Sequence, residues 1–190
     1  MAETKYEARL KTLYDKEIAK ALQKELKLDN INQVPKLEKV MVTAGVGKKR
    51  DDKRYTETVE LTLTKITGQA IVGRKAKKSI AQFKIRKGMG APVGYMTTLR
   101  NDKMYEFVDR LINVALPHVR DFHGVSRKSF DAQGNYSLGL KEQTVFPEIS
   151  FEDAAVLHGV EVTFVIKNGS PEGSLKLLEK FGMPFEKEVK

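Results

Sequence analysis

The chain has 190 residues, of which 41% are hydrophobic, and a formal net charge of +9, so it can bury a real core. It has no cysteine, which excludes disulfides and thiolate zinc sites. We find neither an apolar run long enough to span a membrane nor an N-terminal secretory signal, and we therefore expect a cytoplasmic protein with no membrane partner.

Hydrophobic periodicity predicts a mixture of helices and strands. Helices are expected at 6–28, 54–67, 102–115 and from Pro171 to Gly182, with Asn101 and Ser170 as caps of the last two. Five threonines leave the segment 54–67 ambiguous, because β-branching lowers helix propensity. Strands are expected at 37–46, 69–74, 93–100, 138–146 and 159–167, and a long loop at 118–137.

The predicted strands alternate apolar with polar residues, which is typical of a sheet with one buried face. In the strand at 37–46, Val40, Val42 and Ala44 share one face, while Met41 and Thr43 lie on the other. Each helix has a single apolar stripe. We therefore predict an α+β fold, a mostly antiparallel sheet with helices packed on one face, as a single domain over 1–190. The other face of the sheet would be free to bind a partner.

Charge is distributed very unevenly along the chain. Residues 61–101 contain nine Lys or Arg and no acid, whereas the two flanking parts together sum to zero. A segment with charge of one sign attracts polyanions, and nucleic acid is the first choice. An anionic membrane surface is the alternative, but the segment lacks a basic amphipathic helix with bulky apolar anchors.

No motif indicates catalysis. The histidines at 118, 123 and 158 lack a metal-binding spacing and are interpreted as surface or hydrogen-bonded residues. A phosphate loop around Gly45 and Gly47 fails, because Val42 and Lys49 occupy the positions of the required Gly and Ser or Thr. We therefore expect no enzyme, no cofactor and no metal. An RNA-modifying enzyme remains an alternative without any residue to support it.

Two surfaces are candidates for RNA binding. Residues 73–87 include seven Lys or Arg, which can neutralise phosphates. Phe83 in this segment could stack on an unpaired base or could anchor the loop in the core. The polar face of the sheet could bond ribose and phosphate groups, or could simply be the solvated face of a half-buried sheet.

Several segments together resemble the bacterial family of the fifth large-subunit ribosomal protein. They are 34–47, 66–100, 105–126, 129–149 and 159–165, and the stretch SFDAQGNYSLG at 129–139 is the most specific. The resemblance covers roughly residues 10–185. It implies a structural ribosomal constituent in the central protuberance of the large subunit, with 5S rRNA as its main ligand. The other implied partners are 23S rRNA, the peptidyl-site (P-site) tRNA, a small-subunit head protein and neighbouring ribosomal proteins.

Charge pattern and resemblance together suggest three groups of contact residues. The expected 5S rRNA contacts are Lys36, Lys39, Thr43, Gln69, Arg74, Thr98 and Arg100. The expected tRNA-contacting loop comprises Lys75, Lys77, Lys78, Ser79, Phe83, Lys84 and Arg86. The expected intersubunit bridge comprises Arg120, Asp121, Arg127, Lys128 and Asn135. Thr43 departs from the usual Asn of the family, and a hydroxyl can replace one amide hydrogen bond but not two.

Overall fold

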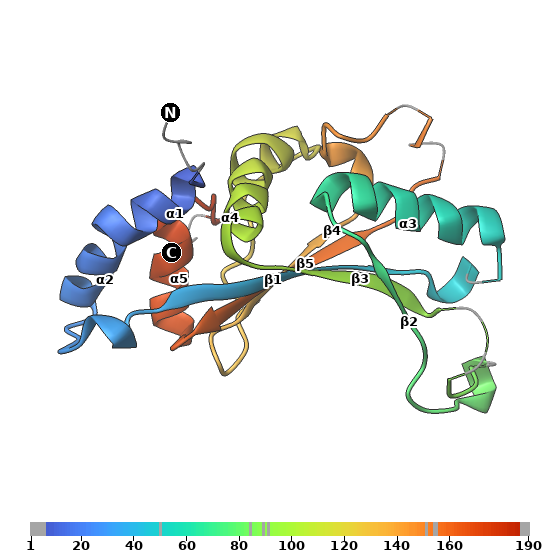
Figure 1. Cartoon of the computed structure of the whole chain (residues 1–190), viewed down its shortest axis with the longest axis horizontal. Helices are drawn as coiled ribbons and strands as arrows, with labels where there is room; N and C mark the ends of the chain where they lie inside the picture. The colour runs from blue at the N-terminus through green and yellow to red at the C-terminus, as the bar shows by residue number, and fades with distance from the viewer. Residues whose placement is uncertain are drawn as a thin grey trace, which may run out of the picture. The chain divides into compact units, whose positions relative to one another are not determined.

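The computed structural model describes residues 7–49, 51–83, 85–88, 90, 92–150, 152–153 and 156–186. The fold is α+β with one antiparallel sheet, as predicted (Figure 1). Its strands are β1 (Lys36–Gly45), β2 (Val72–Arg74), β3 (Gly94–Leu99), β4 (Tyr136–Leu140) and β5 (Val160–Lys167). The strand order is β2-β3-β1-β5-β4, with Val72 opposite Met96 and Arg74 opposite Gly94.

The helices follow the predicted segments closely. The first is continuous from α1 (Arg9–Leu13) through a π-helical turn (Tyr14–Ile18) to α2 (Ala19–Glu25). The others are α3 (Lys53–Thr67), α4 (Asn101–Arg110) and α5 (Pro171–Lys180), and α4 continues through further turns to His118. Within the described ranges, no helix is long and apolar enough to cross a membrane.

The chain divides into two compact units. The first unit comprises Met1–Val40, Leu99–Leu138 and Thr163–Lys190, and the second comprises Met41–Thr98 and Gly139–Val162. Strands β1, β3, β4 and β5 each have residues in both units. The expectation that residues 1–190 form one domain stays a prediction.

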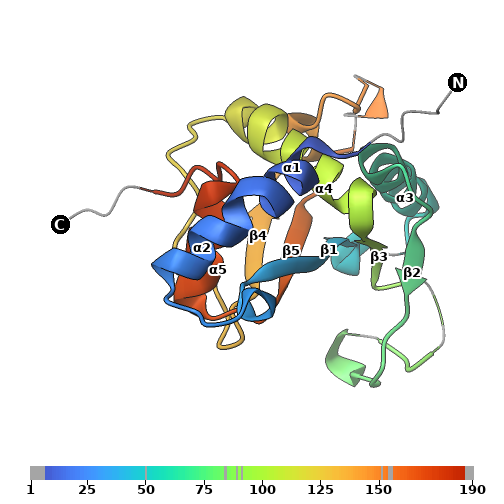
Figure 2. The ribbon, with the colours of Figure 1, turned by 60° about the vertical axis from the view of Figure 1, so that its left-hand side comes forward.

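Helices α1, α2, α4 and α5 build the core of the first unit. The ring of Phe181 packs against Tyr14 and Tyr105, with centroid separations of 6.2 and 6.3 Å. Glu25 of α2 pairs with Lys180 at the end of α5 at 2.7 Å, in agreement with the side-by-side helices of Figures 1 and 2. These contacts join segments from both ends of the chain around one apolar centre.

The ends of the helices depend on individual side chains. Ser170 caps α5 as predicted, its hydroxyl accepting a hydrogen bond from the backbone N–H of Gly173 at 3.1 Å. The predicted cap of α4 is wrong, because Asn101 is the first helical residue and Arg100 occupies the cap position. Asn101 has a φ of +55°, a left-handed conformation that asparagine tolerates better than most residues.

Helix α3 forms in the second unit despite its threonines. The hydroxyls of Thr58, Thr64 and Thr67 each donate to the carbonyl four residues earlier at 2.8 Å. The apolar stripe Val59, Leu63 and Ile66 is fully buried, and this packing outweighs the weak propensity. The predicted end at Gly68 is confirmed, with a φ of +61°.

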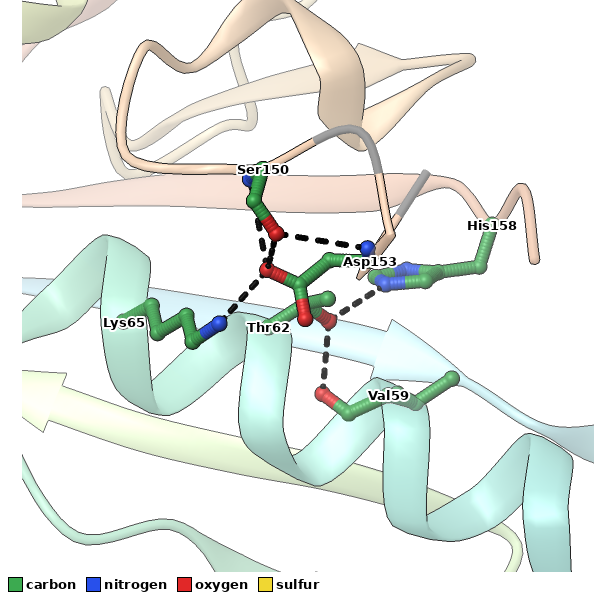
Figure 3. A network of polar contacts seen from close by, with 6 residues as sticks. All are labelled: Val59, Thr62, Lys65, Ser150, Asp153 and His158. Carbon is green, nitrogen blue, oxygen red and sulfur yellow. Dashed lines mark hydrogen bonds and ion pairs between the residues drawn. The ribbon is translucent and has the colours of Figure 1, made fainter. Parts of the chain in front are cut away.

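A polar network fastens the segment after β4 onto α3 (Figure 3). The Thr62 hydroxyl lies 2.7 Å from Nε2 of His158, and Lys65 pairs with Asp153 at 2.6 Å. Ser150 donates to the same Asp153 carboxylate at 2.7 Å. The prediction that His158 is a surface or hydrogen-bonded residue is confirmed in its second form, because it is hydrogen-bonded and only 4% exposed. Burial lowers the pKa of its imidazole, partly opposed by the Gly159 carbonyl.

Two predicted strands have the wrong limits. The predicted strand 138–146 begins at Tyr136 and ends at Leu140, because Gln143 is buried in a 3-10 turn that bonds to Val156 and His158. The predicted strand 69–74 contains only Val72–Arg74. Its first residues are joined to β3 by hydrogen bonds from side chains to backbone carbonyls. The Gln69 amide donates to the Thr98 carbonyl, and the Thr97 hydroxyl donates to the carbonyl of Ala70.

Candidate nucleic-acid interface

In the second unit, the sheet has a face that α3 does not cover. Alternation along β1 buries Val42 and Ala44 on the helix side and leaves Thr43 half-buried on the opposite side. On the neighbouring strand β3, Thr98 is likewise half-buried, between the buried Thr97 and Leu99. We call this surface the open face. Of the described α-helices, the second unit contains α3 alone, and it lies along the other side of the sheet (Figure 1).

Gln69 lies at the edge of the sheet between α3 and β2, outside any strand. Its amide Nε2 donates to the Thr97 hydroxyl at 3.1 Å and to the Thr98 carbonyl at 3.0 Å. The side chain is half-buried, and these two bonds fix its position. The predicted contact residues Gln69 and Thr98 are therefore joined directly.

The other predicted contacts on the open face differ in their surroundings. The Thr43 hydroxyl donates to the carbonyl of Glu161 on β5 at 3.4 Å. The Thr98 hydroxyl has no hydrogen-bond partner among the described residues. Arg74 ends β2 and is exposed, so the edge strand connects the open face to the basic loop.

Lys36, Lys39 and Arg100 belong to the first unit and not to the second. Lys36 is exposed, with its ammonium 5.4 Å from the centre of the Tyr14 ring. Lys39 is half-buried on β1, and Arg100 is exposed before α4. The structure therefore assembles four of the seven expected 5S rRNA contacts within one compact unit: Thr43, Gln69, Arg74 and Thr98.

The basic loop between β2 and β3 extends away from α3 (Figures 1 and 2). Ile80 and Ile85 form an antiparallel bridge with N–H to O distances of 2.9 and 3.1 Å. Ser79 is exposed, and its hydroxyl accepts from the backbone N–H of Lys87 at 2.9 Å. The loop therefore has a hydrogen-bonded hairpin at its centre, although the sequence predicted only a loop.

The cations of this loop are available to a partner. Exposed positions are Arg74, Lys75, Lys77, Lys78, Arg86 and Lys87, and Lys84 lies outside the described residues. None of these exposed cations forms an ion pair within the described part of the chain. Phe83 is 62% exposed, so the alternative that it anchors the loop in the core is wrong.

The expected bridge residues in the first unit fall into two groups. Arg120, Asp121 and Lys128 are exposed. Arg127, in contrast, pairs with Glu179 at 3.0 Å, donates to the Glu186 carbonyl at 3.0 Å and stacks over the Phe185 ring. Its contacts hold the loop against the C-terminal segment.

Asn135 has a similar internal role. Its amide nitrogen donates to Asp131 at 2.8 Å, and its carbonyl oxygen accepts the backbone N–H of Ile166 on β5 at 3.1 Å. Hydrogen bonds from the side chain and backbone of Asn135 lower the pKa of Asp131. The SFDAQGNYSLG motif therefore stabilises a loop on β5, a task that the sequence did not predict for Asn135.

Sequence reasoning missed Glu161. This residue is exposed on β5 between the buried Val160 and Val162, so its side chain lies on the open face next to Thr43. The alternation of the predicted strand 159–167 contained the signal, but a carboxylate is not a residue type that charge alone associates with RNA.

Sequence comparisons agree with this architecture. Residues 30–86 match the family described as Ribosomal protein L5, and residues 92–185 match the model of the C-terminus of the same ribosomal family. The large ribosomal subunit protein uL5 of Syntrophotalea carbinolica is 52% identical over 182 residues, covering 96% of this chain and 98% of that protein. The uL5 protein of Geobacter sulfurreducens is 52% identical over 178 residues, covering 94% and 98%.

The chain belongs to the ribosomal protein L5 family. Its resemblance to that family is thereby confirmed over nearly the whole length. A member of this family is a structural protein of the ribosome and not an enzyme, which removes the RNA-modifying alternative. The loop 75–87 lies at the C-terminal end of the first family region, which ends at residue 86, before the second begins at residue 92.

Proposed function

We propose that this protein is a constituent of the large ribosomal subunit in the cytoplasm and binds 5S rRNA in the central protuberance through the open face. One observation carries the proposal: a helix-free polar sheet face continues into a loop whose exposed cations are not paired among the described residues. Unpaired cations neutralise phosphates, and polar groups on the sheet contribute the selective bonds. The name of the relatives, large ribosomal subunit protein uL5, supports the placement.

The remaining contacts follow from the exposed residues. The basic loop is the proposed contact with the P-site tRNA, with Phe83 offering a face on which a base can stack. Arg120, Asp121 and Lys128 are the proposed bridge contacts to a small-subunit head protein. Lys36, Lys39 and Arg100 are proposed as further RNA contacts from the first unit. Partners in the same subunit are 23S rRNA and neighbouring proteins of the central protuberance.

A gel-shift titration against 5S rRNA tests the main proposal, with a tRNA of similar length as competitor and two salt concentrations. Preferential 5S binding that persists at the higher salt is expected, because bonds from the sheet do not depend on counterion release. Equal binding of both RNAs that collapses with salt would mean that the basic loop alone binds, and would overturn the proposed 5S site.

A further inference from the structure

Two side chains at the open face, Gln69 and Thr43, have their hydrogen-bond donors engaged inside the protein, whereas the Thr98 hydroxyl is left to donate. Both hydrogens of the Gln69 amide are committed, one to Thr97 and one to the Thr98 carbonyl. The orientation of this amide is determined, since a carbonyl only accepts and the Thr97 hydroxyl already donates to Ala70 at 3.3 Å. Only the acceptor Oε1 of Gln69 remains, and it has no partner among the described residues.

The same holds for the neighbouring groups on β1 and β5. The hydrogen of the Thr43 hydroxyl is directed to the Glu161 carbonyl, so that hydroxyl offers lone pairs to a ligand. Glu161 presents a carboxylate, which accepts hydrogen bonds and donates none when ionised. This carboxylate is exposed and forms no ion pair within the described ranges. The adjacent Thr43 and Glu161 on the open face, and Gln69 at the edge of the sheet, therefore each offer an acceptor in one compact unit.

Such a surface is poorly suited to phosphates. A phosphate also has only acceptors and carries negative charge, so it cannot bond to these atoms and is repelled by Glu161. RNA carries complementary donors elsewhere, in its ribose 2′-hydroxyls and in the amino and imino groups of unpaired bases. In this unit, the expected 5S rRNA contact that can meet a phosphate is the exposed Arg74, at the end of β2.

We propose that the open face recognises RNA through ribose 2′-hydroxyls and base N–H groups, which donate to Gln69, Thr43 and Glu161. This inference rests on the proposed function, since it specifies the chemistry of the same RNA site. It assigns Glu161 as a specificity-determining residue. It also separates sugar and base contacts at these acceptors from phosphate contacts, which belong to exposed cations such as Arg74.

Charge substitutions at Glu161 distinguish recognition of RNA donors from phosphate contact, because the first predicts weaker 5S rRNA binding and the second predicts tighter binding. Glu161→Lys should weaken 5S rRNA binding by about tenfold, the loss of a charge-assisted bond, even though it makes the protein more basic. Glu161→Gln keeps one acceptor oxygen and should lose less. Glu57→Lys on α3 makes the same charge change at an exposed position of the helix and should not weaken binding. Tighter binding by Glu161→Lys would overturn the inference and indicate a phosphate contact.

Interference mapping tests the wild-type protein without relying on any variant. 5S rRNA that carries sparse 2′-deoxy or inosine substitutions is mixed with the protein, and the bound RNA is isolated. Substitutions at discrete positions should be depleted from the bound RNA, because each lost donor weakens binding. If only phosphate modifications are depleted from the bound RNA, the inference is overturned, while the proposal that the protein binds 5S rRNA still stands. Failure of unmodified 5S rRNA to bind would instead overturn the proposed function, and the inference with it.

Discussion

At the scale of single residues, His158 is a buried ionisable group whose pKa is lowered by folding. Its ring is buried against α3, with Nε2 beside the Thr62 hydroxyl and its backbone N–H donating to Gln143. The Thr62 hydroxyl also lies 3.0 Å from the Val59 carbonyl oxygen (Figure 3), and His158 Nδ1 lies 3.3 Å from the Gly159 carbonyl oxygen. A buried imidazole in this arrangement resists protonation, which lowers its pKa.

This shift predicts a loss of stability in mild acid. Because the pKa of folded His158 lies below the ordinary value of 6.5, the unfolded chain binds a proton first as the pH falls. The free energy of unfolding should therefore be constant above about pH 7 and decrease as the pH falls below 6.5. Urea denaturation between about pH 5 and 7 measures it, a window above the range in which most carboxylates titrate.

His158→Gln provides the comparison for this measurement. The variant should be less stable at neutral pH but should have a flatter dependence on pH, since it lacks the titrating ring. His123→Gln is the control, because His123 is exposed. Equal slopes for wild type and His158→Gln would show that another group causes the pH dependence.

Much of the candidate site could be predicted residue by residue, but the hydrogen bonds could not. Strand alternation correctly placed Thr43 on the face opposite Val42. Arg127 and Asn135 are residue types typical of contacts with a partner molecule. Their hydrogen-bond partners inside the chain, Glu186 and Ile166, lie 59 and 31 positions away. Only the folded chain determines which polar groups are used internally, and the sequence does not reveal such distant pairings.

At the scale of elements, the loop between α4 and β4 is shaped by close backbone packing. Gly134 has a φ of +78°, and an added Cβ would lie 2.7 Å from the Ser174 hydroxyl and 2.8 Å from a backbone atom of Gly169. Helix and strand types were predicted correctly because they follow from periodicity. Loop shape was not, because it depends on contacts such as these, made with α5 and the turn before it.

Gly134→Ala should therefore destabilise the protein by about 2–5 kcal/mol, the sum of a left-handed alanine and an overpacked contact. Gly139→Ala on β4 is a matched control, since nothing lies within 4 Å of its added Cβ. Chemical denaturation of both variants measures the difference. Similar stabilities would mean that the loop relaxes away from Ser174 at little cost.

The basic loop provides a second prediction at this scale. Lys77→Glu with Lys78→Glu should leave binding of isolated 5S rRNA nearly unchanged, because the open face is intact, but should weaken P-site tRNA binding to ribosomes that contain the variant. Filter binding with each RNA measures both effects. Lys20→Glu with Lys24→Glu, exposed on α2, makes the same charge change as a control. A large loss of 5S affinity would reassign the loop to that RNA.

At the scale of the whole molecule, the sheet bears on how the protein unfolds. Four of the five described strands contribute residues to both compact units, so neither unit has a complete set of strands of its own. We expect a single cooperative transition, with the same midpoint by far-ultraviolet circular dichroism and by tyrosine fluorescence. Two separate midpoints would show that the units unfold independently and that residues 1–190 are not one folding domain.

The hydrogen bonds between the loop 118–137 and the C-terminal residues 184–186 also determine an order of events during synthesis. Val125 donates to the Pro184 carbonyl at 2.8 Å and accepts from Glu186 at 3.0 Å, and Arg127 reaches the same segment. A ribosome makes residues 184–186 well after the loop that they contact. In a nascent chain, that loop therefore lacks these hydrogen bonds until residues 184–186 have emerged. Limited proteolysis of stalled chains of increasing length should find the loop cleavable until then, and protection in shorter chains would contradict this order. The surface proposed to bridge the two subunits is therefore among the last parts of the protein to mature.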